Sequence, residues 1–207
     1  MLEEAGRTDI PVYQGEQSAY EGVTEAAKFL AETVAKYPGE VTIIAVGPLG
    51  NLQAAYEVDN MFFENAGQIV IMGGQTGELI LGDEQIDEFN LSSDHQAAYT
   101  VLNSGANITI LTEQACSDAL FMFKDFQKLK NFPVKWKFFS VFWTALNKVT
   151  TGNNYFIVWD MMPAVYVFNP EYYENEQVYV NSSLDDLQNG YLRISEEGEG
   201  ELMNVPE

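Results

Sequence analysis

Apolar residues recur along positions 21–36 at the spacing of one helical face. The residues of that face are Val23, Ala27, Leu30 and Val34. Proline and glycine at 38–39 then end the periodicity. The apolar run that follows, 41–46, is continuous rather than periodic, and this predicts a buried strand. The regular part of the chain therefore opens with a helix followed by a strand.

The same order of elements recurs further along the chain. The turn 47–51, of sequence GPLGN, ends the first strand and leads into a short helix. Apolar runs at 68–72 and 108–111 predict two more strands, and a helix is predicted between them over 94–103 with Asp94 as its N-cap. Because strand and helix alternate, we expect an α/β fold with a mainly parallel, Rossmann-like sheet and helices on both faces.

The later part of the chain is less regular. Aromatic and apolar residues at helical spacing fill 134–149, namely Trp136, Phe138, Phe139, Phe142, Trp143, Leu146 and Val149. Such a stripe is more often core or subunit interface than a cofactor site, and we expect homo-oligomers to form through it. An extended run at 155–158 and a helix over 161–168 follow. The acidic segment 171–207 is expected to supply edge strands and a solvated tail.

Composition narrows the class of protein. With 207 residues of which 46% are apolar, the chain predicts one globular domain over 1–207. Its formal charge of −21 would repel polymeric nucleic acid and anionic membranes. The single cysteine, Cys116, cannot form an internal disulfide, and no apolar stretch is long enough to cross a bilayer. Without a visible export signal, the chain as given predicts a cytoplasmic protein.

Loop 74–93 holds the first candidates for a site. It follows a predicted strand, and open α/β sheets bind ligands at the carboxyl ends of their strands. In an extended segment Glu88 and Asn90 would point the same way, while Phe89 would point oppositely and anchor the loop in apolar surroundings. Paired donors and acceptors suit sugar hydroxyls. By spacing alone, a solvated acidic loop remains the simpler interpretation.

Trp159 and Asp160 form a second candidate. A carboxylate after a strand can bind a hard cation, and an indole beside it can stack on a base. Asp160 could equally be a helix N-cap. The glycines of 72–77 do not follow the dinucleotide-binding pattern, and the only histidine, His95, has no convincing catalytic serine or cysteine partner.

Five motifs, in order, resemble the inosine-uridine-preferring nucleoside hydrolase family. They are AGRTDIPV at 5–12, GPLGN at 47–51, IVIMGG at 69–74, DEFN at 87–90 followed by Asp94, and WD at 159–160. The resemblance extends from about residue 2 to about residue 173. It implies calcium-assisted hydrolysis of the N-glycosidic bond of purine or pyrimidine ribonucleosides, which yields ribose and the free base.

The resemblance also assigns roles to residues. Asp160 and the backbone carbonyl of Gly50 would bind a calcium ion that holds the ribose hydroxyls. Glu88 and Asn90 would hydrogen-bond the ribose, and the Glu88 carboxylate would favour the positive charge that develops as the base departs. Met72 would contribute to the substrate site. The implied ligand is therefore a small-molecule nucleoside.

Two departures from the family pattern affect these assignments. Many members carry histidine where this chain has Trp159, and that histidine assists the departing base. Trp159 would lie near the base but would not assist it in the same way. A tryptophan at this position leans toward purine nucleosides. The family's opening Asp-x-Asp-x-x-x-Asp-Asp motif, with its strand and its water-activating carboxylate, has no counterpart in the sequence.

Because of the second departure we expect weak or no activity from this chain alone. It would then be a truncated gene product, a degenerate relative or one half of a complemented enzyme. The alternatives for function are a non-catalytic nucleoside or ribose binder and an acidic module that docks a partner through its aromatic helix.

Overall fold

The structure of the protein is a computed structural model, and it describes the chain with several gaps. The described residues are 2–15, 22–81, 83–122, 124–125, 128, 141–143, 145–146, 148–149, 152, 155–195 and 198–207. The chain divides into two compact units. The smaller combines Met1–Val12 with Cys116–Trp159, and the larger combines Tyr13–Ala115 with Asp160–Glu207. The single domain expected over 1–207 stays a prediction.

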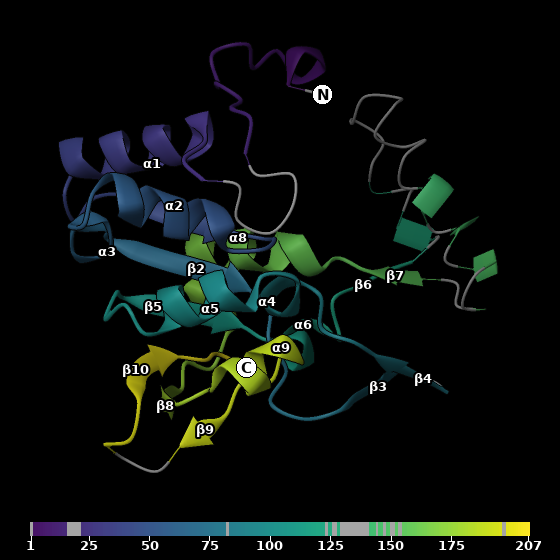
Figure 1. The fold of residues 1–207 in the computed structure, drawn as a ribbon. Helices are drawn as coiled ribbons and strands as arrows, with labels where there is room; N and C mark the ends of the chain where they lie inside the picture. The colour runs from purple at the N-terminus through teal and green to yellow at the C-terminus, as the bar shows by residue number, and fades with distance from the viewer. Residues whose placement is uncertain are drawn as a thin grey trace. The chain divides into compact units, whose positions relative to one another are not determined.

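The larger unit contains the central sheet and most of the described helices (Figure 1). Its strands are β1 (Thr42–Ala45), β2 (Gln68–Met72), β3 (Leu79–Leu81), β4 (Glu84–Ile86), β5 (Ile108–Leu111), β8 (Gln177–Val180), β9 (Ile194–Ser195) and β10 (Glu201–Asn204). Its helices are α1 (Glu25–Lys36), α2 (Gly50–Val58), α3 (Phe62–Asn65), α4 (Asn90–Ser93), α5 (His95–Leu102), α8 (Met162–Phe168), η4 (Pro170–Tyr172) and α9 (Leu184–Gln188), and α6 (Glu113–Cys116) begins in it.

Six of these strands form the central sheet, in the order β1-β2-β5-β10-β8-β9. From β1 to β10 each strand is parallel to the next, with Ile43 opposite Ile69 and Asn204 opposite Thr109. β8 and β9 continue the sheet in antiparallel pairing. The prediction of an α/β fold with a mainly parallel sheet is confirmed. The short strands β3 and β4 form a separate hairpin.

Different helices cover the two faces of the sheet. Ile69 and Ile71 of β2 belong to one apolar core cluster with residues of α1, α2 and α5. Val70 lies between them in the strand and therefore points to the opposite face. α8 packs on that opposite face, where its Tyr166 hydroxyl accepts a hydrogen bond from the Asn204 side chain. Figure 1 shows α1 and α2 side by side above the strands.

Side-chain caps fix where α1 and α5 begin. α1 begins at Glu25, later than the periodicity of 21–36 suggested, because Thr24 caps it by accepting a 3.1 Å hydrogen bond from the amide of Ala27. The predicted cap of α5 is confirmed, since Asp94 accepts a 3.1 Å hydrogen bond from the amide of Ala97. Both caps satisfy N–H groups that have no partner inside the helix.

β1 differs from the buried strand that its apolar sequence predicted. Within the described sheet it pairs with β2 alone, so it is an edge strand. Ile43 is buried against the helices, but Ile44 and the following Val46 are exposed. The continuous apolar run predicted burial on both faces, whereas the face of this edge strand that carries Ile44 and Val46 is only partly covered.

The acidic C-terminal segment, in contrast, is more deeply buried than the sequence suggested. β10 lies between β5 and β8 inside the sheet (Figure 1). Met203 and Val205 are buried, and so are Leu187 of α9 and Leu192 after it. The expectation of a solvated tail is therefore wrong for this part of the chain, although β9 does lie at an edge of the described sheet and Ile194 and Leu202 are exposed.

The described part of the smaller unit contains η1 (Glu3–Ala5) and a two-stranded antiparallel sheet of β6 (Leu120–Met122) and β7 (Tyr155–Ile157), and η3 (Trp159–Met161) begins in it. The extended run at 155–158 therefore does form a strand. However, this strand pairs with β6 and not with the central sheet, so Asp160 does not follow a central strand as expected.

Most of the aromatic stretch 134–149 lies outside the described residues, including Trp136, Phe138 and Phe139. Its described members are all exposed, namely Phe142, Trp143, Leu146 and Val149. The expected interface through this stretch stays a prediction. None of the helices described here is long and apolar enough to span a membrane.

Candidate functional site

The Glu88 side chain lies at the carboxyl end of β2, beneath the loop that carries it. The residue is only 5% exposed. Its Oε1 accepts hydrogen bonds from the amides of Gly74 at 3.1 Å and Leu91 at 2.8 Å, and its Oε2 accepts one from the amide of Ser92 at 2.8 Å. The carboxylate thus joins the turn after β2 to the first turn of α4, and it is not the solvated acid that spacing alone favoured.

Asn90 approaches the same turn by a different route. Its side-chain amide nitrogen donates to the carbonyl oxygen of Met72 at 2.9 Å and also contacts the Met72 sulfur at 3.2 Å. Gly73 lies between the two site residues: a Cβ added there would be 3.1 Å from Glu88 Oε1 and 3.2 Å from Asn90 Cβ. The structure therefore brings Met72, Glu88 and Asn90 together at one end of β2.

The expected geometry of the loop is wrong in one respect. Phe89 has helical backbone angles and Asn90 begins α4, so 88–90 is not extended. Phe89 is 72% exposed, whereas the sequence suggested that it anchors the loop in apolar surroundings. Glu88 supplies the anchor through its hydrogen bonds to the backbone.

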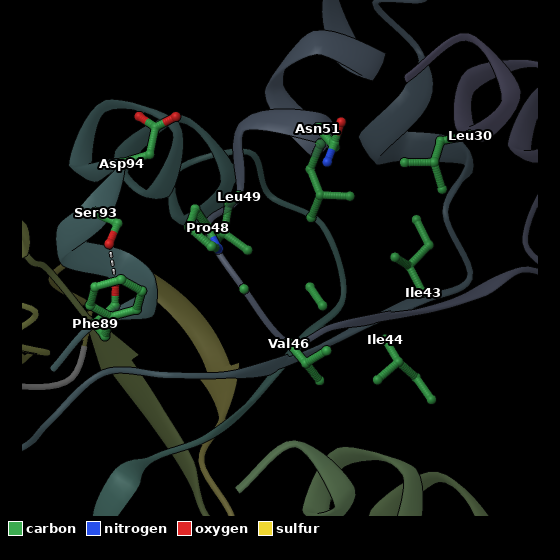
Figure 2. Close-up of a pocket in the computed structure, with 13 residues that line it drawn as sticks. Leu30, Ile43, Ile44, Val46, Pro48, Leu49, Asn51, Phe89, Ser93 and Asp94 are labelled. Carbon is green, nitrogen blue, oxygen red and sulfur yellow. Dashed lines mark hydrogen bonds between the residues drawn. The ribbon is translucent and has the colours of Figure 1, made fainter. Parts of the chain in front are cut away.

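Phe89 instead borders an open cavity of about 720 Å³ beside β1. Figure 2 shows Phe89 beside Ser93, and Pro48 and Leu49 of the turn 47–51 also border the cavity. The other lining residues are Leu30, Ile43, Ile44, Ala45, Val46, Gly47, Asn51, Leu52, Ser93 and Asp94. The cavity is large enough for a small molecule. It brings two of the sequence motifs together, although Glu88 and Asn90 are not among its lining residues.

Gln75 and Glu113 form a buried polar pair next to Glu88. The amide nitrogen of Gln75 donates to Glu113 Oε2 and, at 2.7 Å, to the carbonyl oxygen of Ile86. Burial raises the pKa of Glu113 to about 7; the hydrogen bond from Gln75 lowers that pKa, and the negative charges of Glu88 and Asp87 raise it. A carboxyl group in such surroundings can change its protonation near neutral pH.

The expected calcium ligands do not form a complete site in the described residues. Gly50 is buried at the start of α2, and Asp160 is exposed in η3. Asp160 does not cap α8, whose N-cap is Met161, and partial desolvation raises the pKa of the Asp160 carboxyl. In the described ranges no three His, Cys, Asp or Glu side chains are grouped to hold a metal ion. By themselves these two donors are too few for calcium, which takes about six to eight oxygens.

Trp159 stands at the end of the smaller unit and Asp160 at the start of the next segment of the larger one. The indole is half-buried. Its predicted role near a nucleobase stays a prediction.

Sequence reasoning missed three residues of this region: Gln75, Glu113 and Gly190. A signal for the first two was present, because each follows closely on an apolar strand and so lies at the carboxyl end of the sheet. Gly190 gave no local signal. A Cβ at this position would be 2.3 Å from Glu88 Cβ, and only the folded chain brings these two residues together.

Comparison with known proteins supports the resemblance in the sequence. A family model described as inosine-uridine preferring nucleoside hydrolase matches residues 1–205. Uridine nucleosidase 1 of Arabidopsis thaliana is 46% identical over 87 residues, which are 42% of this chain and 25% of that protein. Probable uridine nucleosidase 2 of the same plant is 33% identical over 138 residues, covering 52% of this chain and 42% of that protein. The chain thus spans less than half the length of these curated relatives.

Solved structures show the same fold at lower identity. A plant nucleoside hydrolase superposes with a TM-score of 0.83 at 23% identity, over 100% of this chain and 78% of that one. A purine-preferring ribonucleoside hydrolase from Gardnerella vaginalis gives a TM-score of 0.76 at 19% identity, over 96% of this chain and 64% of that one. At this identity the likeness is one of fold.

Proposed function

Since this chain belongs to the inosine-uridine preferring nucleoside hydrolase family, we propose that it binds a ribonucleoside and takes part in hydrolysis of its N-glycosidic bond. Water adds to the anomeric carbon, the bond to the base nitrogen breaks, and ribose and free base leave. One observation carries the proposal: the turn at 72–74 and the loop with Glu88 and Asn90 meet at the carboxyl end of β2. Open α/β sheets bind their ligands at this edge.

Asn90 is the proposed ribose-binding residue with the clearest geometry. Its nitrogen is held by Met72, which fixes the orientation of the amide. Within the described part of the chain its Oδ1 accepts no hydrogen bond, so this oxygen can accept one from a ribose hydroxyl. The side chain of Met72 is buried, so in the proposed site Met72 acts by orienting Asn90 and not by contacting the substrate itself.

Glu88 is proposed to act through its charge. The departing base leaves the sugar with oxocarbenium-like positive character, which a fixed carboxylate nearby stabilises. Three backbone N–H groups hold the Glu88 carboxylate in place, so little reorganisation is needed during reaction. Because backbone N–H groups already occupy three of the roughly four acceptor sites of the carboxylate, we assign Glu88 an electrostatic role ahead of a direct hydrogen bond to ribose.

The finer features of the activity remain proposals. Trp159 is assigned to the base, by stacking. Asp160 and the Gly50 carbonyl are the candidate calcium ligands, and no catalytic step is derived from them. Homo-oligomers are proposed as the assembled form. The printed names of the relatives include uridine nucleosidases and a purine-preferring hydrolase, so the test uses both kinds of nucleoside.

The hydrogen bonds of Glu88 also favour a second function, which is nucleoside binding without hydrolysis. A carboxylate whose two oxygens accept hydrogen bonds from backbone N–H groups could serve as a loop anchor in a ribose-binding protein. In that case the chain binds nucleosides without turnover. Binding and hydrolysis must therefore be measured separately.

The test is calorimetric titration of the chain with inosine and with uridine, each with and without calcium, followed by an assay for released base. We expect binding of at least one nucleoside and a loss of affinity of about 1 kcal/mol or more, roughly fivefold, in Asn90→Ala. Binding without released base would favour the second function.

Asn107→Ala is the matched control. Asn107 also donates from its side-chain nitrogen to a backbone carbonyl, that of Gly67 at 3.0 Å, but at the opposite end of the sheet. It should leave nucleoside affinity unchanged. No binding of either nucleoside to the folded chain, or equal effects of the two substitutions, would contradict the proposal.

A further inference from the structure

The loop with Glu88 and Asn90 is fastened by a side-chain bridge that starts at a second buried acid. Glu113 begins α6, directly beyond the end of β5, and is 7% exposed. Its amide donates to the carbonyl oxygen of Gly74 at 3.0 Å, which ties it to the turn after β2. Its carboxyl accepts from Gln75, whose amide group also holds the carbonyl oxygen of Ile86. A single Gln75 side chain thus links Glu113 to the loop two residues before Glu88.

The backbone of Gln75 extends the link to the segment after α9. Its backbone N–H donates to the carbonyl oxygen of Gly190 at 2.9 Å, and its carbonyl oxygen accepts a hydrogen bond from the backbone N–H of Leu192 at 2.8 Å. Gly190 in turn lies against Glu88, with space for a hydrogen but not for a Cβ. Movement of Gln75 would therefore disturb Glu88 from two directions, through Ile86 and through Gly190.

Burial is the main cause that raises the pKa of Glu113, the hydrogen bond from Gln75 opposes it, and the acids of the loop add to it. Asp87 and Glu88 on the loop are both acidic, and each raises the pKa of Glu113. The segment after α9 adds Tyr191, and Arg193 of that segment pairs with Asp186 of α9, so that the charges of this pair offset each other. A proton on Glu113 removes the repulsion from the loop, whereas its loss adds a negative charge beneath two others.

We propose that Glu113 is a positioning residue of the site: protonated, it lies beneath the loop without a buried charge, and on ionisation the cost of that charge and the repulsion from Asp87 and Glu88 outweigh the stronger hydrogen bond from Gln75 and loosen the loop that presents Glu88 and Asn90. The proposal rests on the proposed function for its ligand, a ribonucleoside. Its structural part, the pH-dependent fastening of the loop, does not require any ligand.

The direction of the pH effect follows from linkage. The pKa of Glu113 is about 7 in the folded chain against an ordinary value of 4.5. The folded loop therefore binds the proton more strongly than the opened one, so its stability is complete at low pH and falls as pH rises from about 4.5 to about 7. Above that window the loop remains in its less stable form.

Amide hydrogen exchange measures the effect without a nucleoside. The reporters are the amides of Gly74, Leu91 and Ser92, which donate to Glu88. After correction for intrinsic exchange, we expect their protection to fall roughly tenfold between pH 6 and pH 8 in the unaltered chain. Glu113→Gln, which keeps an acceptor for Gln75 but cannot ionise, should remove this pH dependence.

Glu78→Gln is the control, because it removes an exposed carboxylate from the same loop and changes the net charge equally. It should keep the pH dependence of the unaltered chain. The affinity for inosine or uridine, titrated at pH 6 and pH 8, should weaken with pH in the unaltered chain and in Glu78→Gln, and stay constant in Glu113→Gln.

The outcomes separate this inference from the proposed function. Flat protection between pH 6 and pH 8 in the unaltered chain overturns the inference, even if Glu113→Gln fails to fold. A pH dependence that persists in folded Glu113→Gln also overturns it. Nucleoside binding with flat protection leaves the proposed function standing alone, whereas pH-dependent protection without nucleoside binding supports the loop fastening and rejects the proposed function.

Discussion

Glu88 is confined by the residues around it as well as by its hydrogen bonds. Gly190 has a φ of 68°, and a Cβ there would be 2.3 Å from both Glu88 Cβ and Glu88 Oε2. Backbone in this left-handed region already favours glycine. The packing against Glu88 adds a second reason for glycine at this position, and the two reasons can be measured apart.

Gly190→Ala is expected to destabilise the protein by about 2–4 kcal/mol, because it combines left-handed backbone strain with overpacking against Glu88. Chemical denaturation measures the change in the free energy of unfolding. Gly105→Ala is the matched control, since Gly105 has a φ of 71° and no atom within 4 Å of an added Cβ. It should cost only about 1–2 kcal/mol. Equal costs for the two substitutions would show that Gly190 does not confine Glu88.

Residue-level reasoning selected Glu88 and Asn90 from their neighbours but gave the wrong geometry. The alternation rule applies to extended backbone, and Asn90 begins a helix. What brings both side chains to β2 is the hydrogen bonding of each to the turn 72–74. The residue types were readable from sequence, whereas their partners in the turn 72–74 lie 14 and 18 positions away.

At the scale of elements, the start of α1 is tied to the turn 47–51. Thr24 caps the helix through Ala27, and its hydroxyl also donates to the side-chain oxygen of Asn51 at 3.2 Å. A residue at the end of one element thus supports a turn that lines the cavity beside β1.

We expect Thr24→Ala to lower the free energy of unfolding by about 1 kcal/mol or slightly more, because the cap is lost together with the link to Asn51. Thr100→Ala removes a hydroxyl that, among the described residues, bonds only back to Gln96 within α5, so its effect should stay within about 0.5 kcal/mol of zero. Thermal or chemical unfolding distinguishes the two. A loss in Thr100→Ala as large as in Thr24→Ala would argue against the importance of the cap.

Elements with strong local signals were predicted well. The strands at 68–72 and 108–111 have the predicted bounds, since each is a continuous apolar run ended by polar or glycine residues. α9 was missed although Ser183 and Asp186 form a capping box around its start. Its acidic surroundings concealed the signal, because the segment was interpreted from its charge.

At the scale of the whole molecule, the C-terminal strand holds the sheet together. β10 is the link between the parallel strands and the antiparallel pair β8 and β9. Asn204 at its end donates to the Tyr166 hydroxyl and to the Asn175 side-chain oxygen, each at 2.8 Å. Elements from three parts of the chain therefore meet at this strand.

Met203→Ala should cost about 2–4 kcal/mol of stability, because Met203 is 1% exposed in the core of the sheet. Leu202→Ala, one position earlier on the same strand, removes a side chain that is 52% exposed and should cost less than about 1 kcal/mol. Urea titration of both variants provides the measurement. If Met203→Ala were no more costly than Leu202→Ala, the segment would be the solvated tail that its charge suggested.

The sequence by itself determined the parts of this protein that depend on neighbouring residues. These are the periodicity of α1, the apolar strands, the cap at Asp94 and the motifs that indicated the family. Only the tertiary structure decided the edge position of β1, the burial of β10 and the bridge from Glu113 through Gln75 to Ile86. The physical reason is that these features depend on contacts between residues far apart in the chain, and such contacts leave no periodic or capping signal in the local sequence.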